Sequence, residues 1–343
     1  MAALLISTLI LLLYQWILDR SYRYPHLREA FRFNEAASLN SSIEARSRTK
    51  KLPEAIIIGS RKSGTRALLK FLEINPQVRS AHNEVHFFDK PQNYKLGLEW
   101  YREQMPESEE HSLTIEKSPA YFVTKGVPER VKLMNPGIKL ILVLRDPVKR
   151  LISDYSQLVA NRVKVGRNNF HNASDQNLVD KLIDMNEDDL WNNSKQEFKE
   201  HVLRPDGGID DRRASIRTGM YSVHLERWLF HFNMSQIHIV DGETLIKDPH
   251  EELHKVELFL SLEPRIKPEH FVYNQQKGFY CISSAAIPQR WNITNSTILC
   301  LSKSKGRRHV QVDENLVMKL SKFYEPYNDY LYSMIGREFV WNL

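Results

Sequence analysis

The chain has 343 residues, of which 42% are hydrophobic and 26% are charged. These fractions are typical of a folded globular protein and exclude a disordered chain, a collagen-like repeat and a polytopic membrane protein. There are 48 Lys and Arg residues against 42 Asp and Glu residues, which gives a net charge of +6. This excess of positive charge is too small for a protein that coats nucleic acid, so we expect no nucleic-acid partner. It does allow one local basic surface for an acidic ligand.

The N-terminal segment is almost wholly apolar from Ala2 to Leu18. A run of this length is at the lower limit for a helix that spans a membrane. No small-residue cleavage motif follows it, so we expect residues 1–18 to be an uncleaved membrane anchor, with a cleaved signal peptide as the alternative. No Lys or Arg precedes the run, so the positive-inside rule does not support a cytoplasmic N-terminus.

Both alternatives send the chain into a secretory compartment, and two further features agree with this. Six Asn-x-Ser/Thr sequons are expected glycosylation sites, at Asn40, Asn172, Asn192, Asn233, Asn292 and Asn295. The two cysteines, Cys281 and Cys300, are too few for a disulfide scaffold or a four-cysteine zinc site, but they could form one bridge. Residues 19–52 are polar and read as a stem, and residues 53–343 as a single folded domain.

Short apolar runs alternate with helical patterns along this domain. Strands are predicted at Ala55–Ile58, Leu113–Ile115, Leu140–Leu144 and Ile237–Val240, and helices at Thr65–Leu72, Val127–Met134, Val148–Val159 and about His250–Leu260. This alternation indicates an α/β fold, a parallel sheet flanked by helices on both faces. The segment from Arg162 to Asp211 is polar and poorly periodic, and we expect surface loops or an inserted element there.

The strongest local signal is the strand–turn–helix segment AIIIGSRKSGTRALL, residues 55–69. A strand that runs through a glycine-bounded turn into a helix aims backbone amides and the positive end of the helix at an anion. Gly59 and Gly64 have Walker A spacing, but Thr65 stands where a Walker A loop has lysine. The lysine is instead Lys62, inside the turn. The pattern therefore predicts a P-loop-like phosphate site that does not use ATP.

From Pro53 to Trp341 the chain resembles the PAPS-dependent sulfotransferases, and more narrowly the heparan sulfate glucosamine 3-O-sulfotransferases (PAPS is 3′-phosphoadenylyl sulfate). The resemblance rests on ordered motifs at compatible spacings: GSRKSGTRALL at 59–69, EVHFFD at 84–89, EKSPAYF at 116–122, LRDPVKRLISDY at 144–155, YSVHLERWL at 221–229, GFYC at 278–281 and SKGRRH at 304–309. Ser60 and Ser63 depart from the Val and Gly expected in vertebrate relatives.

The resemblance implies the sulfotransferase fold and a PAPS site without a metal ion. The residues expected to bind PAPS are Lys62, Ser63, Gly64, Thr65, Arg66, Arg145, Ser153, Lys305, Gly306, Arg307, Arg308 and His309. Arg145 and Ser153 match the pair that binds the 3′-phosphate, which ATP lacks. An arginine fork beside a hydroxyl is also a sound phosphate clamp in physical terms.

The resemblance also assigns the chemistry. Glu84 is expected to be the general base, with His86 beside it and Lys62 stabilising the leaving group. If residues 84–88 are extended, Glu84, His86 and Phe88 share one face. The residues expected to contact the acceptor sugar are Arg66, Glu84, His86, Asp89, Lys117, Ser118, Pro119, Ala120 and Gln157.

The expected function is transfer of the sulfuryl group from PAPS to the 3-hydroxyl of glucosamine in heparan sulfate. The alternatives are another glycosaminoglycan sulfotransferase, such as a glucosamine N-sulfotransferase, and a non-catalytic heparin-binding protein on the same fold. We expect Cys281 and Cys300 to be joined, close to the segment 305–309. The expected location is the Golgi membrane, as a single-pass type II protein with a lumenal catalytic domain.

Overall fold

The structure is a computed structural model that describes residues 48–169, 187–293, 298–301 and 308–341. The chain divides into two compact units, residues 1–49 with 107–111 and residues 50–106 with 112–343. The second unit contains the five-stranded sheet, its flanking helices and the three-stranded sheet, while β4 (Glu107–Ser108) lies in the first unit. The predicted anchor, residues 1–18, and most of the predicted stem lie outside the described residues. Within the described ranges, no helix is both long and apolar enough to cross a membrane.

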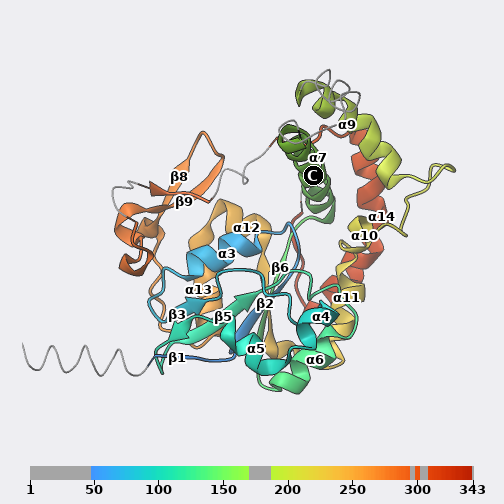
Figure 1. Cartoon of the computed structure of the whole chain (residues 1–343). Coiled ribbons are helices and arrows are strands. Elements are labelled where there is room, and N and C mark those ends of the chain that lie inside the picture. The colour runs from blue at the N-terminus through green and yellow to red at the C-terminus, as the bar shows by residue number, and fades with distance from the viewer. Residues whose placement is uncertain (1–47, 170–186, 294–297, 302–307, 342–343) are drawn as a thin grey trace, which may run out of the picture. The chain divides into compact units, whose positions relative to one another are not determined.

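The second unit is built on a parallel sheet with the strand order β3-β5-β2-β6-β7 (Figure 1). Its strands are β2 (Ala55–Gly59), β3 (Val78–Ser80), β5 (Leu113–Lys117), β6 (Lys139–Leu144) and β7 (Ile237–Asp241). The pairings are parallel throughout. Strands β2 and β5 are buried along their whole length, which explains the continuous apolar sequence of β2, whereas β5 also buries Thr114, Glu116 and Lys117. The predicted α/β fold is therefore confirmed.

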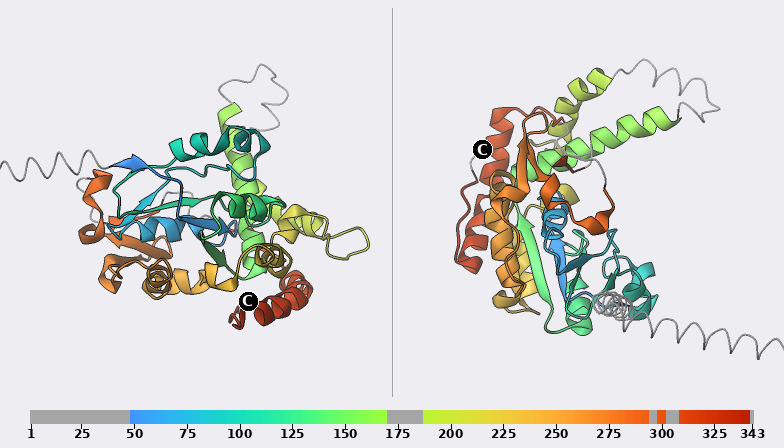
Figure 2. Two further views of the ribbon diagram at one scale, coloured as in Figure 1. Left: turned by 90° about the horizontal axis from the view of Figure 1, so that it is seen from below. Right: turned by 90° about the vertical axis from the view of Figure 1, so that its left-hand side faces the viewer.

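Helices cover both faces of the sheet because successive side chains of each strand point to opposite sides (Figure 2). Ile56 and Ile58 join one core, with α6 (Val127–Met134), α11 (Tyr221–Leu229) and the end of α14 (Glu314–Ile335). Ala55 and Ile57 join the other core, with α3 (Thr65–Leu72), α12 (Gly242–Lys247) and α13 (Pro249–Phe259). The sheet is thereby held between two helical layers.

A third core forms where α7 (Pro147–Asn169), α9 (Glu187–Val202) and α14 meet (Figure 1). Phe198 of α9 is fully buried there. We expected surface loops or an inserted element from Arg162 to Asp211. The structure instead continues α7 to Asn169 and places α9 within this segment. The helices are stabilised by packing against α14, which the weak periodicity of their own sequence does not reveal.

Like β3, α11, α12 and α14, the remaining strands and α-helices were not predicted. They are β1 (Thr49–Lys50), β4 (Glu107–Ser108), α4 (Pro91–Tyr94), α5 (Gly97–Glu103), α10 (Ala214–Arg217) and a three-stranded antiparallel sheet of β8 (Phe271–Asn274), β9 (Phe279–Ser283) and β10 (Ile298–Leu299). Cys281 in β9 is joined to Cys300, which follows β10 directly, so the predicted disulfide is confirmed.

Candidate active site

The turn between β2 and α3 forms the floor of the site. Gly64 is the N-terminal capping residue of α3, and its φ of 111° is a left-handed conformation that favours glycine. No side chain caps this helix end, and Gly64, Thr65 and Arg66 at the start of α3 line the cavity. Gly242, at the start of α12, packs against the turn so closely that a Cβ there would lie 2.7 Å from the carbonyl oxygen of Ser63.

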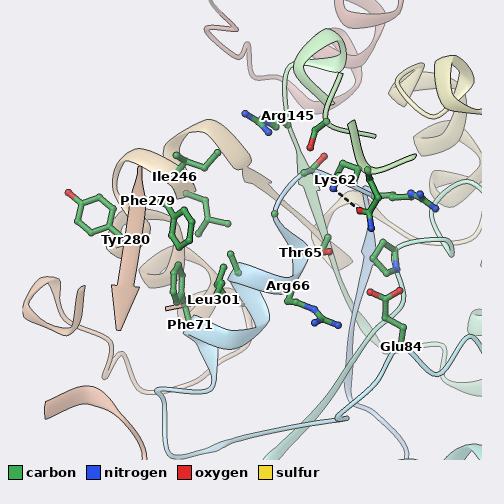
Figure 3. Close-up of a pocket in the computed structure, with 18 of the residues that line it drawn as sticks. Lys62, Thr65, Arg66, Phe71, Glu84, Arg145, Ile246, Phe279, Tyr280 and Leu301 are labelled. Carbon is green, nitrogen blue, oxygen red and sulfur yellow. Dashed lines mark hydrogen bonds between the residues drawn. The ribbon is translucent and has the colours of Figure 1, made fainter. Parts of the chain in front are cut away.

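A cavity of about 710 Å³ opens above this turn (Figure 3). Thirteen of the predicted site residues line it: Lys62, Ser63, Gly64, Thr65, Arg66, Glu84, His86, Pro119, Ala120, Arg145, Ser153, Gln157 and His309. They come from the carboxyl-terminal ends of the parallel strands and from the segments that follow, where α/β proteins place their ligands. The structure thus brings residues from distant motifs into one site.

Two cations of the site already have partners. Lys62 Nζ donates a hydrogen bond to Gln157 Oε1 at 2.9 Å. Arg145 Nε donates to Glu243 Oε1 at 2.8 Å, and both side chains are largely buried. Glu243 was not predicted, and its carboxylate fixes the guanidinium of Arg145, while Ser153 lines the same cavity.

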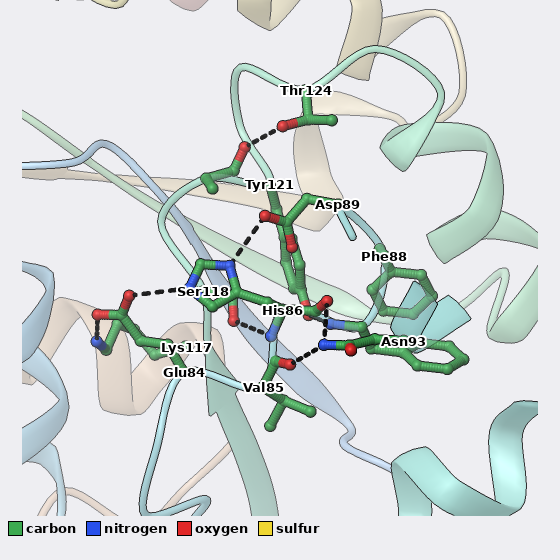
Figure 4. Close-up of polar contacts among 12 residues, drawn as sticks. Glu84, Val85, His86, Phe88, Asp89, Asn93, Lys117, Ser118, Tyr121 and Thr124 are labelled. Carbon is green, nitrogen blue, oxygen red and sulfur yellow. Dashed lines mark hydrogen bonds and ion pairs between the residues drawn. The ribbon is translucent and has the colours of Figure 1, made fainter. Parts of the chain in front are cut away.

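Glu84 lies at the centre of a group of charged side chains (Figure 4). It is paired with Lys117 Nζ, and its second oxygen lies 3.4 Å from His86 Nε2. The other ring nitrogen of His86 lies 2.9 Å from Asp89 Oδ2. Burial raises the pKa of Glu84, but the hydrogen bond and charge of Lys117, with His86 and Arg66, outweigh it, so the pKa lies below its usual value. Glu84 is therefore held as a carboxylate.

Two expectations about this group need correction. Residues 84–88 are not extended, because His86 has a φ of 54° and residues 87–89 form a turn. Phe88 consequently packs in the core, fully buried, while Glu84 and His86 remain neighbours. Ser118 was expected to contact the substrate, but it is fully buried and does not line the cavity.

Lys117, at the end of β5, does not line the cavity either and is only 4% exposed. Burial lowers its pKa, in spite of the hydrogen bond to Glu84. Asp89 also lies outside the lining. Neither side chain therefore reaches the cavity itself: Lys117 contacts Glu84, and Asp89 contacts His86.

Glu116 is a buried carboxylate beneath this group and was not predicted as a site residue. Its side chain is fully buried and accepts hydrogen bonds from Tyr101, Ser118 and the backbone of Val85. Burial raises the pKa of Glu116 to about 7, although these donors and Lys117 act in the opposite direction. An ionised Glu116 therefore opposes folding at neutral pH.

We expect Glu116→Gln to change the pH dependence of stability. A raised carboxyl pKa contributes stability below its unfolded value of about 4.5, and this is lost as pH rises through about 7. Wild type should lose about 2 kcal/mol of this stability between about pH 5.5 and about pH 8, because Glu116 ionises. The variant should not lose it, because Gln does not titrate, so the difference in free energy of unfolding, variant minus wild type, should increase by the same amount. Urea unfolding at both pH values measures this, with the exposed Glu99→Gln as control. An equal difference at both pH values would contradict it.

Several lining residues were missed by the sequence reasoning: Arg61, Ala67, Phe71, Leu245, Ile246, Lys277, Gly278, Phe279, Tyr280 and Leu301. Phe71 and Phe279 lie on the opposite side of the cavity from Glu84 (Figure 3). The GFYC motif, residues 278–281, was the only signal for this wall. Tyr280 and Leu301 each adjoin one cysteine of the disulfide. Lys305, Gly306 and Arg307 lie outside the described residues, and Arg308 stacks over Trp191 at 5.7 Å.

The described part of the chain contains no group of three or more His, Cys, Asp or Glu side chains arranged to hold a metal ion. Of the predicted glycosylation sites, Asn233 and Asn292 are exposed. Asn40, Asn172 and Asn295 lie outside the described residues, and the side chain of Asn192 is not described.

Known proteins match this chain along most of its length. Residues 52–333 match the sulfotransferase domain family. Heparan sulfate glucosamine 3-O-sulfotransferase 5 of Mus musculus is 39% identical over 310 residues, which cover 90% of this chain and 80% of the mouse protein. Heparan sulfate glucosamine 3-O-sulfotransferase 3B1 of Homo sapiens is 40% identical over 302 residues, or 88% of this chain and 68% of the human protein.

A sulfotransferase from Alicyclobacillus acidocaldarius, known from its crystal structure, has the same fold, with a TM-score of 0.52 and 17% identity. The match covers 84% of this chain and 97% of the bacterial protein. The chain belongs to the sulfotransferase family, and within it to the heparan sulfate glucosamine 3-O-sulfotransferases.

Proposed function

We propose that this protein transfers the sulfuryl group of PAPS to the 3-hydroxyl of glucosamine units in heparan sulfate. The observation that carries the proposal is a single cavity that joins an anion-binding turn, the Arg145–Ser153 pair and the Glu84–His86 pair. Relatives that are 39–40% identical and carry this activity in their names support the same reaction.

The residues of the cavity fit PAPS, which supplies an activated sulfuryl group when it is bound. The amides at the start of α3 and Lys62 suit the 5′-phosphosulfate, because a helix N-terminus and a lysine both favour an anion. Arg145 and Ser153 suit the 3′-phosphate. Phe71 and Phe279 offer an apolar wall for the base. A volume of about 710 Å³ is in the range of cavities that hold ligands of this size.

In the reaction, Glu84 accepts the proton of the acceptor hydroxyl while His86 orients the Glu84 carboxylate. Lys62 neutralises the charge that develops on the leaving oxygen. Arg66, whose charge acts on Glu84 from α3, contributes to binding the acidic sugar chain. These side chains supply the positioning and the electrostatic stabilisation that a group transfer of this kind requires.

Transfer from radiolabelled PAPS to heparan sulfate, followed by disaccharide mapping, tests the proposal. We expect label at the 3-position of glucosamine. Label on the amino group would identify a glucosamine N-sulfotransferase instead. Binding of the polysaccharide without transfer would identify a non-catalytic heparin-binding protein.

The proposal includes the place where the enzyme acts. We place it in the Golgi membrane as a single-pass type II protein, with residues 1–18 as the anchor and the catalytic domain in the lumen. The length of the apolar run and the six sequons support this location. Protease protection of sealed Golgi vesicles tests the topology, since a cytoplasmic domain would be digested.

Replacing Arg145 by Ala should weaken the binding of PAP, the nucleotide product, by about 10- to 100-fold, the usual loss for a charge-assisted hydrogen bond. Affinity for heparan sulfate should change less than about twofold. Titration calorimetry with each ligand measures both, and Arg265→Ala serves as control because Arg265 is exposed and does not line the cavity. Equal losses for both ligands would show that Arg145 does not bind the nucleotide specifically.

A further inference from the structure

The backbone of the segment that carries Glu84 is bound by side chains of the EKSPAYF motif. Three consecutive amides each donate to a side-chain oxygen of residues 116–121 (Figure 4 shows part of this contact). The donor–acceptor pairs are Val85 N to Glu116 Oε1 at 3.3 Å, His86 N to Ser118 Oγ at 3.0 Å, and Phe87 N to Tyr121 Oη at 2.9 Å. The segment is thus attached to the end of β5, at Glu116, and to residues that follow this strand, although it belongs to no strand itself.

Backbone carbonyl groups of the same segment also accept hydrogen bonds. Asn93 Nδ2 donates to the carbonyl oxygens of both Val85 and His86, each at 3.1 Å. His86 has a φ of 54°, a left-handed conformation that is uncommon for a residue with a side chain. Such a conformation persists only when the surroundings determine it, and strained backbone of this kind is concentrated at functional sites.

Glu116 is the innermost member of this arrangement. The hydroxyl of Ser118 donates to Glu116 Oε1, so a lone pair of Ser118 is left to accept the amide of His86. Tyr101 Oη donates to Glu116 Oε2 at 3.2 Å, and its ring stacks on Phe87 with the centroids 4.5 Å apart. Glu116 therefore fixes two of the three amides, that of Val85 directly and that of His86 through Ser118.

A carboxylate at this position is costly for folding alone. Burying a charge is unfavourable unless it is well paired, and an apolar residue of similar volume is often at least as stable. The charged and titratable groups that face Glu116 are Lys117, Tyr101 and Tyr121, and Lys117 is already bonded to Glu84. Glu116 does not line the cavity, so it does not touch a ligand there.

We infer that Glu116 is a positioning residue, which holds the Glu84 carboxylate at the acceptor hydroxyl by fixing the amides of Val85 and His86. The inference rests on the proposed function, since it gives Glu84 its part in the transfer. Loss of the acceptor at Glu116 leaves the Val85 amide unpaired and releases Ser118, so Glu84 is displaced without any change in the ligand contacts. A displacement of about 1 Å in a catalytic group can cost about 100-fold in rate.

The test compares Glu116→Met, which removes the acceptor, with Glu116→Gln, which keeps one. Glu116→Met should lower kcat by about 30-fold and leave the KM values for PAPS and heparan sulfate within about threefold. Glu116→Gln should recover kcat to within about fivefold of wild type. The concentration of folded enzyme is determined by titration with PAP, so that unfolded protein does not count as lost activity.

The matched control is Glu257→Met. Glu257 is also fully buried and accepts hydrogen bonds from Asn75, Arg265 and Ile266, but it does not line the cavity and contacts no residue of the Glu84 segment. The Glu257→Met variant should be less stable than the wild type, while its kcat stays within about twofold of the wild-type value. If Glu116→Met does not fold, Ser118→Ala takes its place, with an expected loss of about tenfold in kcat and none in affinity.

A double-mutant cycle with Glu84→Gln decides whether the effect passes through the base. In the Glu84→Gln background, Glu116→Met should change the residual rate less than about threefold, because no base is left to misplace. If Glu116→Met still lowers the rate by the full 30-fold in the Glu84→Gln background, the inference is overturned. It is also overturned if the single variant Glu116→Met has the kcat of the wild type. If the wild-type enzyme transfers nothing to the 3-position, the proposed function itself is wrong.

Discussion

Glu84→Gln should lower kcat by about 1000-fold and leave the affinity for PAP unchanged. General acid–base catalysis contributes about 10²- to 10⁴-fold, and Gln keeps the shape of the side chain while it removes the base. The variant also keeps an acceptor for Lys117 and a neighbour for His86, so the surroundings of residue 84 should be retained. The measurement is steady-state transfer to heparan sulfate beside calorimetric titration with PAP.

The pH dependence gives a second test of the same assignment. Because the pKa of Glu84 lies below its usual value of 4.5, the carboxylate is present throughout the neutral range and is lost only as pH falls through that low value. Wild-type kcat should therefore show no loss from Glu84 until the pH is below about 4.5. In Lys117→Met, the effect of burial is no longer opposed by Lys117, so the acid limb should move to higher pH.

Glu99→Gln is the control for the charge change, since Glu99 is 82% exposed and lies on α5 outside the cavity. Its kcat should equal that of the wild type. A Glu84→Gln enzyme that keeps its rate within about fivefold would show that another group takes the proton. His86 would then be the first residue to replace, because its ring lies 3.4 Å from Glu84.

The central fold could be predicted because its signal is local. Each of the four predicted strands is short and mostly apolar, as burial on both faces of a parallel sheet favours, although two of them contain a polar residue, Thr114 and His238. Strand β3 has three residues, Val78–Ser80, and only Val78 is fully buried, so its sequence carries little pattern. Helix α14 contains Pro326, which argues against a helix locally, and it is stabilised by packing against α7 and α11.

The site was predicted where its residues follow a recognisable strand or turn. Lys117 ends β5, Arg145 follows β6 directly and Lys62 lies in the turn after β2, and a parallel sheet brings these carboxyl-terminal ends to one edge. Glu243 and Ile246 could not be placed in the same way, because the position of α12 depends on its packing against the turn at Gly242.

Glu116 is a residue of the site region that was not predicted from the sequence. It lies inside a motif that the sequence reasoning used, and it follows the apolar run Leu113–Ile115 on a strand that proved to be buried. A carboxylate in such a strand must have partners or a raised pKa. The partners come from Val85 and Tyr101, which are distant in sequence, so the local pattern could signal an unusual glutamate but not its role.

Lys62→Ala should lower kcat by about 100- to 1000-fold, the loss that follows when one group that stabilises developing charge is removed. Lys62 lies inside the turn and lines the cavity, where its ammonium donates a hydrogen bond to Gln157 Oε1 at 2.9 Å. The loss should fall mainly on kcat, because the charge on the leaving oxygen develops in the transition state and is smaller in the bound ground state. Single-turnover transfer measures the chemical step directly.

Chemical rescue separates loss of the cation from damage to the turn. Propylammonium has the size and charge of the deleted group, so it should restore part of the rate of Lys62→Ala in proportion to its concentration, while a neutral amide of the same size should not. Lys70→Ala is the control, because Lys70 lies on α3, pairs with Glu73 and stacks on Trp291 outside the cavity. The Lys70→Ala variant should keep the wild-type rate and show no response to propylammonium. If Lys62→Ala weakens the binding of PAPS as strongly as it lowers kcat, Lys62 acts mainly on the bound ground state. The cation that stabilises the leaving oxygen would then have to be sought elsewhere, first at Arg66 of α3, which also lines the cavity.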